Sequence, residues 1–366
     1  MTDRMMIHRF INQRERDYIP TNLIRVITGE YYDQSMSCAN RPLFITWNIT
    51  NRCNMHCRYC SLSDKQHNET LIDAERIAES IISIHPLYVS ILGGEPTLIE
   101  TLPRIIQKLT DSGTFVEIVT NGTGITDDFI GSLCDVDRNL LRIEVSLDSV
   151  DKDINDRNRS PGSYDAATSA IKRITKASIR CRVQMTLYHG NFDQIKELYK
   201  YCCNEGVSSF GFSKVAQFGK GTEEDIDYES IYIQCEEIIN NEDITRFEKI
   251  RIGENISMLK DWFTCKDLNK ALRNEYIKCN GARTKIHIEP DGHVYPCDFL
   301  IYPEFYMGRI WEDFWYSESA VKFRTINRTI KEGCSECSNF SCNTGCFALS
   351  YKNFKDTGTM NPNCKL

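Results

Sequence analysis

The sequence predicts an α/β protein, a partial (βα)6 TIM-like barrel followed by a small cysteine-rich C-terminal domain. Two observations predict the barrel: short apolar runs recur six times between residues 43 and 215, and amphipathic helical patterns separate them. A third observation predicts the appended domain. From Cys279 onward, turn residues, aromatic residues and cysteines replace the helical periodicity, as in a small domain that metal holds together.

The six expected strands are rich in Ile, Val, Phe and Leu, which is typical of strands buried on both faces. They cover residues 43–50, 87–94, 115–122, 140–148, 179–188 and 210–215. Helices are expected near residues 72–84, 102–109, 127–133, 164–175 and 191–204, and Thr70 and Asn191 stand where an N-cap residue would begin two of them. Alternating strands and helices pair in parallel through right-handed crossovers, which brings the chemistry to the carboxyl ends of the strands.

The expected organisation has four parts. Residues 1–42 are an N-terminal extension, residues 43–240 the barrel, residues 241–278 a connecting segment and residues 279–366 the cysteine-rich domain. Residues 223–241 have the pattern of an acidic helix, and residues 218–221 are expected to be a simple turn after the sixth strand. The boundary between the two domains falls between residues 240 and 278.

Composition is that of an ordinary globular protein, with 41% hydrophobic and 26% charged residues. The net charge of −7 and the lack of a Lys/Arg-rich run give nucleic-acid binding no support. The first 18 residues lack the apolar stretch of a signal peptide or of a membrane span, so a cytoplasmic protein without membrane contact is expected. Thiols stay reduced in that compartment, where clustered cysteines usually bind metal.

Three of the seventeen cysteines stand together immediately after the first expected strand, at Cys53, Cys57 and Cys60. Three thiolates occupy three of the four positions of a cubane iron–sulfur cluster and leave one iron open. The alternative is a structural zinc site. Such sites are usually closed by four ligands on paired C-x2-C hooks, which C-x3-C-x2-C does not provide.

This C-x3-C-x2-C spacing, with Tyr59 before the last cysteine, resembles the radical SAM superfamily. The resemblance implies a [4Fe-4S] cluster whose open iron binds the amino and carboxylate groups of S-adenosyl-L-methionine (SAM). An electron from the cluster then breaks a carbon–sulfur bond of SAM, and the resulting 5′-deoxyadenosyl radical abstracts hydrogen from a substrate. In such an enzyme Tyr59 would lie near the adenine.

Further motifs at expected strand ends are similar to those of the same superfamily. Gly93-Gly94-Glu95-Pro96 looks like its motif for the methionyl amino group, since glycines allow a close backbone approach and a carboxylate accepts hydrogen bonds from an ammonium group. Thr120 and Ser146 match positions that contact SAM in similar enzymes. Capping of a strand end would equally explain each of these two hydroxyl groups.

The stretch from Asn155 to Tyr164 resembles a His-Asp-x-x-Arg…Gly-Ser-Phe stretch of the superfamily. Arg159 matches the arginine that pairs with the SAM carboxylate in similar enzymes. Asn155 replaces the histidine, and Arg157 is a second candidate for the role of Arg159. The alternative for Arg159 is a solvated surface residue.

A second group of cysteines lies in the last third of the chain. Seven thiols fall one short of two four-cysteine sites, and Cys265 is the nearest spare. Two zinc sites are the alternative, because both metals use C-x2-C pairs. His287 and His293 are expected to be strand or turn residues, since the cysteines nearly suffice. The seven are Cys279, Cys297, Cys334, Cys337, Cys342, Cys346 and Cys364.

Beside the first triad, this group resembles the SPASM domain of sulfatase-maturating enzymes and of ribosomal-peptide maturases. The resemblance implies one auxiliary [4Fe-4S] cluster on Cys279, Cys297 and Cys346, with either Cys265 as the fourth ligand or an open coordination position. The family's usual run is C-x2-C-x5-C-x3-C, whereas this chain has four residues in place of five. The second auxiliary [4Fe-4S] cluster would be bound by Cys334, Cys337, Cys342 and Cys364.

Asp298 directly follows Cys297 in a stretch close to the one in sulfatase-maturating enzymes where this aspartate is a general base. The resemblance implies that the Asp298 carboxylate accepts the proton released when a substrate radical is oxidised. The alternative is a turn residue that bonds backbone N–H groups near the sulfur atoms.

The function that follows from the resemblance is oxidation, cross-linking or epimerisation of a peptide or protein side chain. An electron donor such as flavodoxin or ferredoxin would reduce the first cluster. About 42 residues precede the first strand, too few for the winged-helix leader-binding domain of many peptide maturases. A separate leader-peptide-binding protein is therefore one expected partner, and direct docking of the peptide is the other possibility.

Two alternatives concern other substrates or other classes of protein. The same radical chemistry can dehydrogenate a small molecule such as a sugar or an aminocyclitol, although those enzymes often have one auxiliary cluster. A non-enzymatic zinc or iron–sulfur scaffold would use the same cysteines to bind a partner. Metal analysis separates the scaffold from the enzyme, because three cubanes contain about twelve irons per chain.

Overall fold

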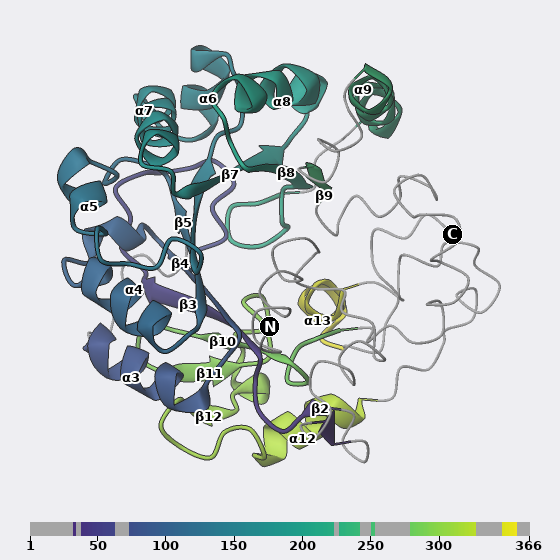
Figure 1. Ribbon diagram of the computed structural model, residues 1–366. Coiled ribbons are helices and arrows are strands. Elements are labelled where there is room, and N and C mark those ends of the chain that lie inside the picture. Colours follow the sequence, from purple (N-terminus) through teal and green to yellow (C-terminus); the bar gives the residue numbers. More distant parts are fainter. Residues whose placement is uncertain are drawn as a thin grey trace. The chain divides into compact units, whose positions relative to one another are not determined.

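The computed structural model describes residues 32–33, 38–62, 73–222, 227–241, 250–252, 279–326 and 346–356 (Figure 1). These residues divide into two compact units. The barrel unit comprises the described residues within Trp47–Ile82 and Tyr88–Ile256. The C-terminal unit comprises those within Met1–Thr46, Ser83–Leu87 and Ser257–Leu366.

The barrel unit is built on a parallel sheet, which confirms the predicted α/β fold. β3 (Phe44–Thr50) lies beside β4, and its residues from Trp47 onward belong to this unit. The described strands from β4 onward pair in parallel in chain order, as helical crossovers require. They are β4 (Tyr88–Gly93), β5 (Phe115–Thr120), β6 (Leu141–Ser146), β7 (Arg180–Leu187), β8 (Ser209–Lys214) and β9 (Ile250–Ile252).

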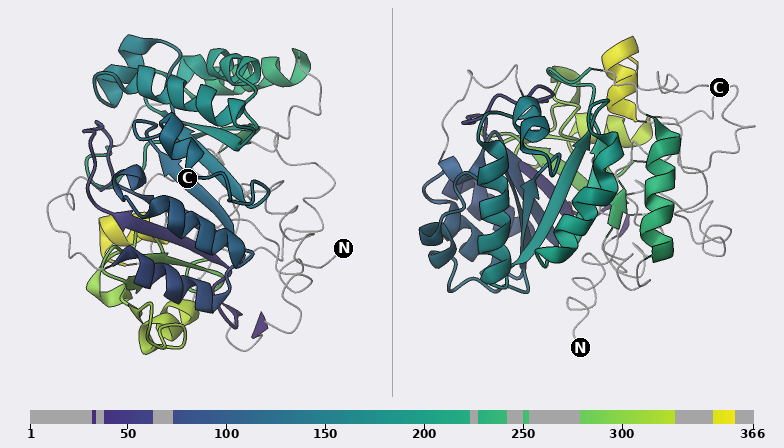
Figure 2. Two further views of the ribbon diagram at one scale, coloured as in Figure 1. Left: turned by 60° about the vertical axis from the view of Figure 1, so that its left-hand side comes forward. Right: turned by 90° about the horizontal axis from the view of Figure 1, so that it is seen from above.

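Helices cover one face of this sheet, and Figure 2 shows them lying along the strands. Apolar side chains fill the space between the two layers; Ile91 and Ile118 on strands and Ile105 and Ile171 on helices are fully buried. Among the described helices, none has both the length and the apolar character needed to cross a membrane. The helical elements are α3 (Ala74–Ile84), η2 (Pro96–Leu98), α4 (Leu102–Asp111), α5 (Asp127–Gly131), α6 (Lys152–Asn158), α7 (Ser163–Lys176), η3 (Phe192–Gln194), α8 (Ile195–Asn204) and α9 (Tyr228–Asn241).

Asn191 occupies the expected N-cap position, at the start of η3, which runs directly into α8, but its side chain makes no cap bond. Oδ1 of Asn191 accepts a hydrogen bond from Tyr188 N–H, while Nδ2 donates to the carbonyl oxygens of Asp148 and Thr186, each at 2.9 Å. The amide side chain therefore ties the ends of two strands together. Thr70, the other expected N-cap, lies outside the described residues.

The other face of the sheet carries buried charges, which the nearly continuous apolar strands do not predict. Arg142 Nε lies 2.6 Å from Glu117 Oε1, and Arg182 Nη1 lies 3.1 Å from Glu144 Oε2. Glu117 is paired in register with Arg142, and Glu144 with Arg182. The hydroxyl of Tyr88 also donates to Glu117. Pairing and hydrogen bonding are the conditions under which charges are buried in a protein interior.

The C-terminal unit contains short antiparallel strands and helices. β10 (Lys285–Ile288), β11 (His293–Tyr295) and β12 (Gly308–Arg309) form an antiparallel series. A second pair joins β1 (Tyr32–Asp33) to β2 (Cys38–Ala39). The helical elements are η5 (Pro303–Phe305), α12 (Glu318–Thr325) and α13 (Phe347–Phe354).

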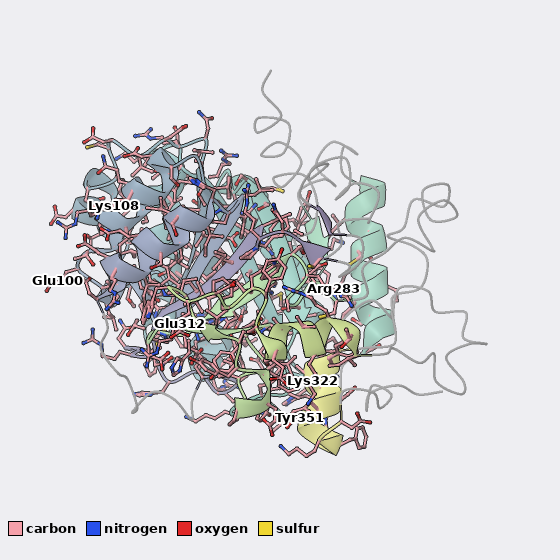
Figure 3. The ribbon with its side chains drawn as sticks, turned by 90° about the horizontal axis from the view of Figure 1, so that it is seen from below. Glu100, Lys108, Arg283, Glu312, Lys322 and Tyr351 are labelled. Atoms are coloured by element: carbon pink, nitrogen blue, oxygen red, sulfur yellow. The ribbon has the colours of Figure 1, made fainter. Side chains whose placement is uncertain are left out.

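Aromatic side chains form the core of this unit. Phe305 meets Tyr351, which Figure 3 labels, with ring centroids 4.8 Å apart. Phe323 stands edge-on to both Phe305 and Phe347, at 5.9 Å from each. Such pairs contribute about 0.5–1.5 kcal/mol each beyond their buried area. The described part of this unit thus has an apolar core of its own, besides the cysteines that are expected to bind metal.

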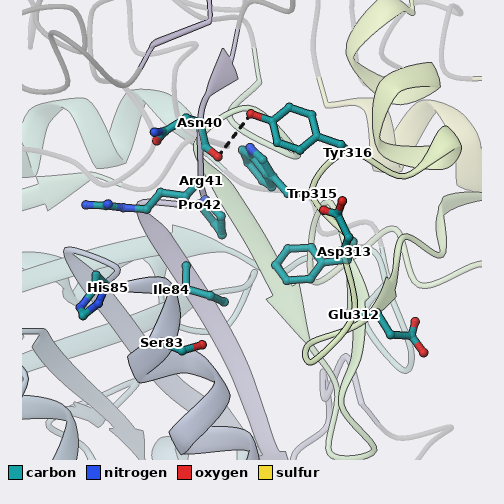
Figure 4. Close-up of a pocket in the computed structure, with 11 residues that line it drawn as sticks. Asn40, Arg41, Pro42, Ser83, Ile84, His85, Glu312, Asp313, Trp315 and Tyr316 are labelled. Atoms are coloured by element: carbon teal, nitrogen blue, oxygen red, sulfur yellow. Dashed lines mark hydrogen bonds between the residues drawn. The ribbon is translucent and has the colours of Figure 1, made fainter.

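A cavity of about 310 Å³ also lies in the C-terminal unit, lined by residues 40–42, 83–85 and 312–316 (Figure 4). Two of its aromatic side chains bond the neighbouring backbone: Trp315 Nε1 donates to Ala39 O at 2.8 Å, and the Tyr316 hydroxyl to Asn40 O at 3.4 Å. No site residue predicted from the sequence lines this cavity.

Candidate functional site

The three clustered cysteines lie on the loop that follows β3. Cys53, Cys57 and Cys60 are each partly exposed, and none forms a disulfide. Burial raises the pKa of Cys57 to about 11; Arg159 opposes this, while Asp148, Cys60 and Cys53 add to it. Burial likewise raises the pKa of Cys53, and Cys60 contributes to the rise. The three thiols therefore lie close enough to interact electrostatically.

This thiol group fits a positively charged iron–sulfur centre. Thiolates that repel one another in a partly buried loop are stabilised by bound metal, which reverses the local effect on their pKa. Within the described ranges, no three His, Cys, Asp or Glu side chains form a group that could hold a single metal ion. The thiols that bind a cubane cluster lie farther apart than the ligands of a single metal ion, because each thiolate binds a different iron.

Backbone hydrogen bonds fix the cysteine loop from two sides. Lys220 N–H donates to the Cys60 carbonyl oxygen at 3.0 Å, and Arg58 N–H donates to the Asn158 carbonyl oxygen at 2.9 Å. Gly219 has a φ of +56°, and a Cβ there would come within 2.4 Å of the Cys60 oxygen. The loop at residues 218–221 is therefore more than the simple turn expected, because it packs directly on the last cysteine of the triad.

Gly93 and Gly94 stand where the end of β4 meets the end of β3. Gly94 N–H donates to Thr50 O at 2.7 Å, and Glu95 N–H donates to Arg52 O at 2.8 Å. A Cβ would lie 2.3 Å from Thr50 O if added to Gly93, and 1.9 Å from Arg52 O if added to Gly94. Close approach of the chain's own backbone at the cysteine loop thus explains both glycines.

The Glu95 carboxylate is buried and accepts four hydrogen bonds. Oε1 accepts from the hydroxyls of Thr97 and Thr120, both at 2.6 Å, and from Thr97 N–H at 3.2 Å. Oε2 accepts from Asn121 N–H at 2.8 Å. Burial raises the pKa of Glu95 in spite of these bonds. Glu95 and Thr120 together join the ends of β4 and β5.

Asp148 is fully buried just beyond β6, and the sequence does not single it out. Its Oδ1 accepts from the Arg159 guanidinium at 2.8 Å and from Thr186 N–H at 2.9 Å. Its Oδ2 accepts from the Tyr59 hydroxyl and from Asn158 Nδ2, the latter at 2.8 Å. One carboxylate therefore fixes Tyr59 on the cysteine loop and Arg159 at the end of α6.

Arg159 is only 7% exposed, so the alternative of a solvated surface residue is wrong. Burial alone would lower the pKa of Arg159, but Asp148 and Tyr59 raise it above the ordinary range. Its Nε is buried without an acceptor among the described residues, and Asn158 Oδ1 is likewise without a donor. A cationic N–H that lacks an acceptor fits an anionic ligand group such as a carboxylate.

Two further residues of the same region have defined positions. Ser146 ends β6 and is partly exposed. Asn155, which stands where similar enzymes have histidine, is buried; its Oδ1 accepts from Asp148 N–H and its Nδ2 donates to the Ser163 hydroxyl, both at 2.9 Å. Asn155 therefore helps to position Asp148. The signal that could have revealed Asp148 is its place directly after a strand end, near Asn155 and Arg159 in sequence.

The C-terminal unit brings three expected auxiliary ligands together. Burial raises the pKa of Cys297 well above its usual range, and Asp298, Cys346 and Cys279 raise it further. The three thiols assigned to the first auxiliary cluster are thus near enough to interact. The other expected auxiliary ligands lie outside the described residues and stay predictions: Cys265, Cys334, Cys337, Cys342 and Cys364.

Asp298 lies between a thiol and an ammonium group. The Cys297 thiol donates to its Oδ1 at 3.3 Å, and Lys285 Nζ lies 3.6 Å from the same oxygen. Burial alone would raise the pKa of Asp298, but Lys285 and His287 lower it below the ordinary value. An ionised carboxylate in this position is able to accept a proton.

His287 is a buried residue of β10, as the sequence suggests. Its Nδ1 lies 3.0 Å from Thr46 Oγ1, and its Nε2 lies 2.8 Å from Glu289 Oε1. Both ring nitrogens therefore have hydrogen-bond partners within the protein.

Two family models match this chain. Residues 47–202 match the radical SAM superfamily, and residues 279–338 match SPASM, an iron–sulfur cluster-binding domain. These two domains imply SAM, a [4Fe-4S] cluster that binds it, and auxiliary iron–sulfur clusters.

Individual proteins are similar over most of the chain. Mycofactocin maturase MftC of Mycolicibacterium smegmatis is 24% identical over 85% of this chain and 79% of its own length. AdoMet-dependent heme synthase of Methanosarcina barkeri is 24% identical over 90% of this chain and 98% of its own length. The structure of Streptococcus suis SuiB bound to the precursor peptide SuiA has a TM-score of 0.73 at 18% identity, covering 94% of this chain and 80% of that chain, and shows the same fold.

Proposed function

Since the chain carries a radical SAM domain followed by a SPASM domain, we propose that it is a maturase that modifies a peptide or protein side chain by radical chemistry. The observation that supports this most is the Cys53, Cys57 and Cys60 group beside the buried Arg159–Asp148 pair. Among its relatives, MftC is a maturase, and SuiB binds a precursor peptide. The modification would be an oxidation, a cross-link or an epimerisation.

In this proposal Cys53, Cys57 and Cys60 would hold a [4Fe-4S] cluster and would leave one of its positions open for SAM. When bound, the cluster and SAM would supply the radical chemistry that removes a hydrogen atom from the substrate. The protein itself has to bind SAM in one orientation and exclude other reductants and water from the radical.

Arg159 is proposed to bind the SAM carboxylate, because its charge is fixed by Asp148 and its Nε has no acceptor among the described residues. Tyr59 is proposed to lie beside the adenine, held there through its bond to Asp148. The strand-end residues Gly93, Gly94, Glu95, Thr120 and Ser146 would complete the SAM site. The hydrogen bond from the Thr120 hydroxyl to Glu95 would hold these strand ends in place in the absence of SAM.

Asp298 is proposed as the group that takes the proton from the oxidised substrate, because Lys285 keeps it ionised. Cys279, Cys297 and Cys346 would hold an auxiliary cluster beside it, with Cys265 as a fourth ligand. Cys334, Cys337, Cys342 and Cys364 are proposed to bind the second auxiliary cluster.

The same proposal includes a cytoplasmic location, an electron donor such as flavodoxin or ferredoxin and a separate leader-peptide-binding protein.

A second candidate is the same chemistry on a small molecule. The heme synthase relative supports it, since the similarity extends over 98% of that protein, and its name points to a tetrapyrrole rather than to the sugar or aminocyclitol that the sequence suggests as an alternative. The shared fold and cofactors do not separate these substrates, because radical SAM chemistry acts on both.

Anaerobic incubation with SAM, dithionite and candidate substrates tests the proposal. Short precursor peptides encoded beside the gene and a set of iron-free and iron-containing tetrapyrroles are supplied separately, and 5′-deoxyadenosine and substrate mass are measured. The proposal predicts that one peptide increases 5′-deoxyadenosine formation and changes its own mass. Stimulation by a tetrapyrrole alone would support the second candidate, and a protein that never cleaves SAM would contradict both.

A further inference from the structure

The cysteine loop is locally cationic in a protein of net charge −7. Between residues 51 and 62 the chain has Arg52, His56 and Arg58 and no acidic residue. The side chains of His56 and Arg58 are exposed to solvent on either side of Cys57. Two exposed cationic side chains thus flank Cys57 on the loop of the proposed cluster ligands.

Two other elements add cations to the same place. Lys220 is exposed, and its N–H bonds the Cys60 carbonyl oxygen. Arg157 is exposed near the end of α6, and the next residue, Asn158, accepts the bond from Arg58 N–H. The Arg58 guanidinium lies 5.8 Å from the centre of the Tyr188 ring, which limits its range of positions. Three separate segments whose backbones bond one another at the cysteine loop therefore each carry an exposed cation.

These charges are not neutralised by the carboxylates that the structure describes. Arg58, Arg157 and Lys220 form no ion pair with any of them. The acidic neighbour of Arg157, Asp156, points its carboxylate at Gly162 N–H and at the hydroxyl of Ser163 instead. Exposed cations with no ionic partner among the described residues can attract an oppositely charged surface over distances of about 10 Å at moderate ionic strength.

We propose that Arg58, Arg157 and Lys220 form the docking surface for an acidic one-electron carrier protein that reduces the cluster on Cys53, Cys57 and Cys60. This inference rests on the proposed function, because it requires a redox centre at those cysteines. On docking, the carrier loses one electron and the cluster gains it, and no atom or proton is exchanged. The area needed is small, since transient redox complexes bury less than about 1,200 Å² and depend on charge for their association rate.

Charge reversal at Arg58 and Lys220 tests the docking surface directly. The variant Arg58→Glu/Lys220→Glu is compared with the wild type for SAM cleavage driven by reduced flavodoxin, which is acidic, and by dithionite, which needs no docking. With flavodoxin, we expect the double variant to cleave SAM about tenfold more slowly than the wild type, or more slowly still. With dithionite, its rate should lie within about twofold of the wild-type rate. The charge-conserving variant Arg58→Lys/Lys220→Arg should retain both rates.

Lys172→Glu provides the matched control, because Lys172 is exposed on α7, outside the segments whose backbone bonds hold the cysteine loop. It changes the net charge in the same sense as each single reversal and should leave the flavodoxin rate unchanged. If Lys172→Glu slows the flavodoxin reaction as much as a single reversal at Arg58, net charge rather than a docking surface is responsible, and the proposal fails.

A binding measurement makes the test independent of turnover. The dissociation constant of oxidised flavodoxin for the cluster-loaded protein is measured by calorimetry at about 50 mM and about 300 mM salt. The wild type should bind more weakly at high salt, and Arg58→Glu/Lys220→Glu should bind weakly at both concentrations. Equal binding by the two proteins at low salt, or equal loss of the flavodoxin and dithionite rates, would overturn the docking surface. A wild type that cleaves no SAM with dithionite would instead overturn the proposed function.

Discussion

The Arg159 guanidinium lies 2.8 Å from the Asp148 carboxylate, and both side chains are buried. The same carboxylate accepts the Tyr59 hydroxyl, so one buried acid links the cysteine loop to the residue proposed to bind SAM. Removing one partner of such a pair leaves an uncompensated charge in the interior, whereas removing both does not. Comparing single and double variants of the two residues therefore separates the contribution of the pair to stability from its contribution to SAM binding.

We expect Asp148→Asn to lower the free energy of unfolding by about 3–5 kcal/mol, because Arg159 then stays buried without its counter-charge. Urea unfolding of the anaerobically purified protein measures the change. The double variant Asp148→Asn/Arg159→Met should recover much of that stability and still fail to bind SAM in equilibrium dialysis. An Asp148→Asn protein with unchanged stability and unchanged SAM affinity would contradict the role assigned to this pair.

Glu95→Gln is predicted to destabilise the protein by about 1–3 kcal/mol. Four donors face the carboxylate on both oxygens, and an amide has one acceptor oxygen, so at least one donor meets the amide NH2 group instead. Urea unfolding measures the loss. Glu100→Gln, at an exposed position labelled in Figure 3, is the matched control and should change stability by less than about 0.5 kcal/mol. Equal effects at both positions would show that the four bonds are not the cause.

Gly219→Ala is expected to displace the cysteine loop and to lower iron loading after anaerobic reconstitution. A Cβ at this position would clash with the Cys60 carbonyl oxygen. The positive φ of Gly219 adds a backbone strain of about 1–2 kcal/mol for alanine. Gly206→Ala shares the positive φ but places its Cβ in open space, so it controls for backbone strain alone. Iron and acid-labile sulfide per chain are the measurement; identical values for the two variants would show that the contact with Cys60 does not position the loop.

Cys297→Ala is predicted to remove about four irons per chain and to leave SAM cleavage with dithionite intact, because the cluster proposed for Cys297 is distinct from the one proposed to bind SAM. Iron analysis and 5′-deoxyadenosine formation are measured together. Cys134→Ala, at an exposed cysteine outside both groups, should retain all the iron. If the iron content of Cys297→Ala equals that of Cys134→Ala, Cys297 is not a cluster ligand.

The strands could be predicted from the sequence because parallel strands buried on both faces are nearly continuous apolar runs. β3, β5 and β7 begin and end within two residues of the expected positions. The short helix α6 could not be predicted in this way. Its residues are mostly polar, and it is defined by a cap, where Asp151 accepts from the N–H groups of Asp153 and Ile154.

The cysteine groups could be predicted because ligand spacing along the chain is itself the signal. The hydrogen-bond partners that organise the site could not, because they come from distant segments. Asp148 bonds Thr186 from β7 and Tyr59 from the cysteine loop, and no local pattern relates these positions. The Glu117–Arg142 pair could not be predicted for a similar reason, since each residue taken alone is typical of an exposed position until its in-register neighbour is known.

Cys53, Cys57 and Cys60 are proposed to hold the centre that cleaves SAM. The most direct test is the yield of 5′-deoxyadenosine from SAM and dithionite, measured anaerobically for the wild type and for Cys53→Ala/Cys57→Ala/Cys60→Ala. We predict that the wild type forms 5′-deoxyadenosine and that the triple variant forms none while keeping the iron of its auxiliary clusters. Formation of 5′-deoxyadenosine by the triple variant at the wild-type rate would contradict the claim.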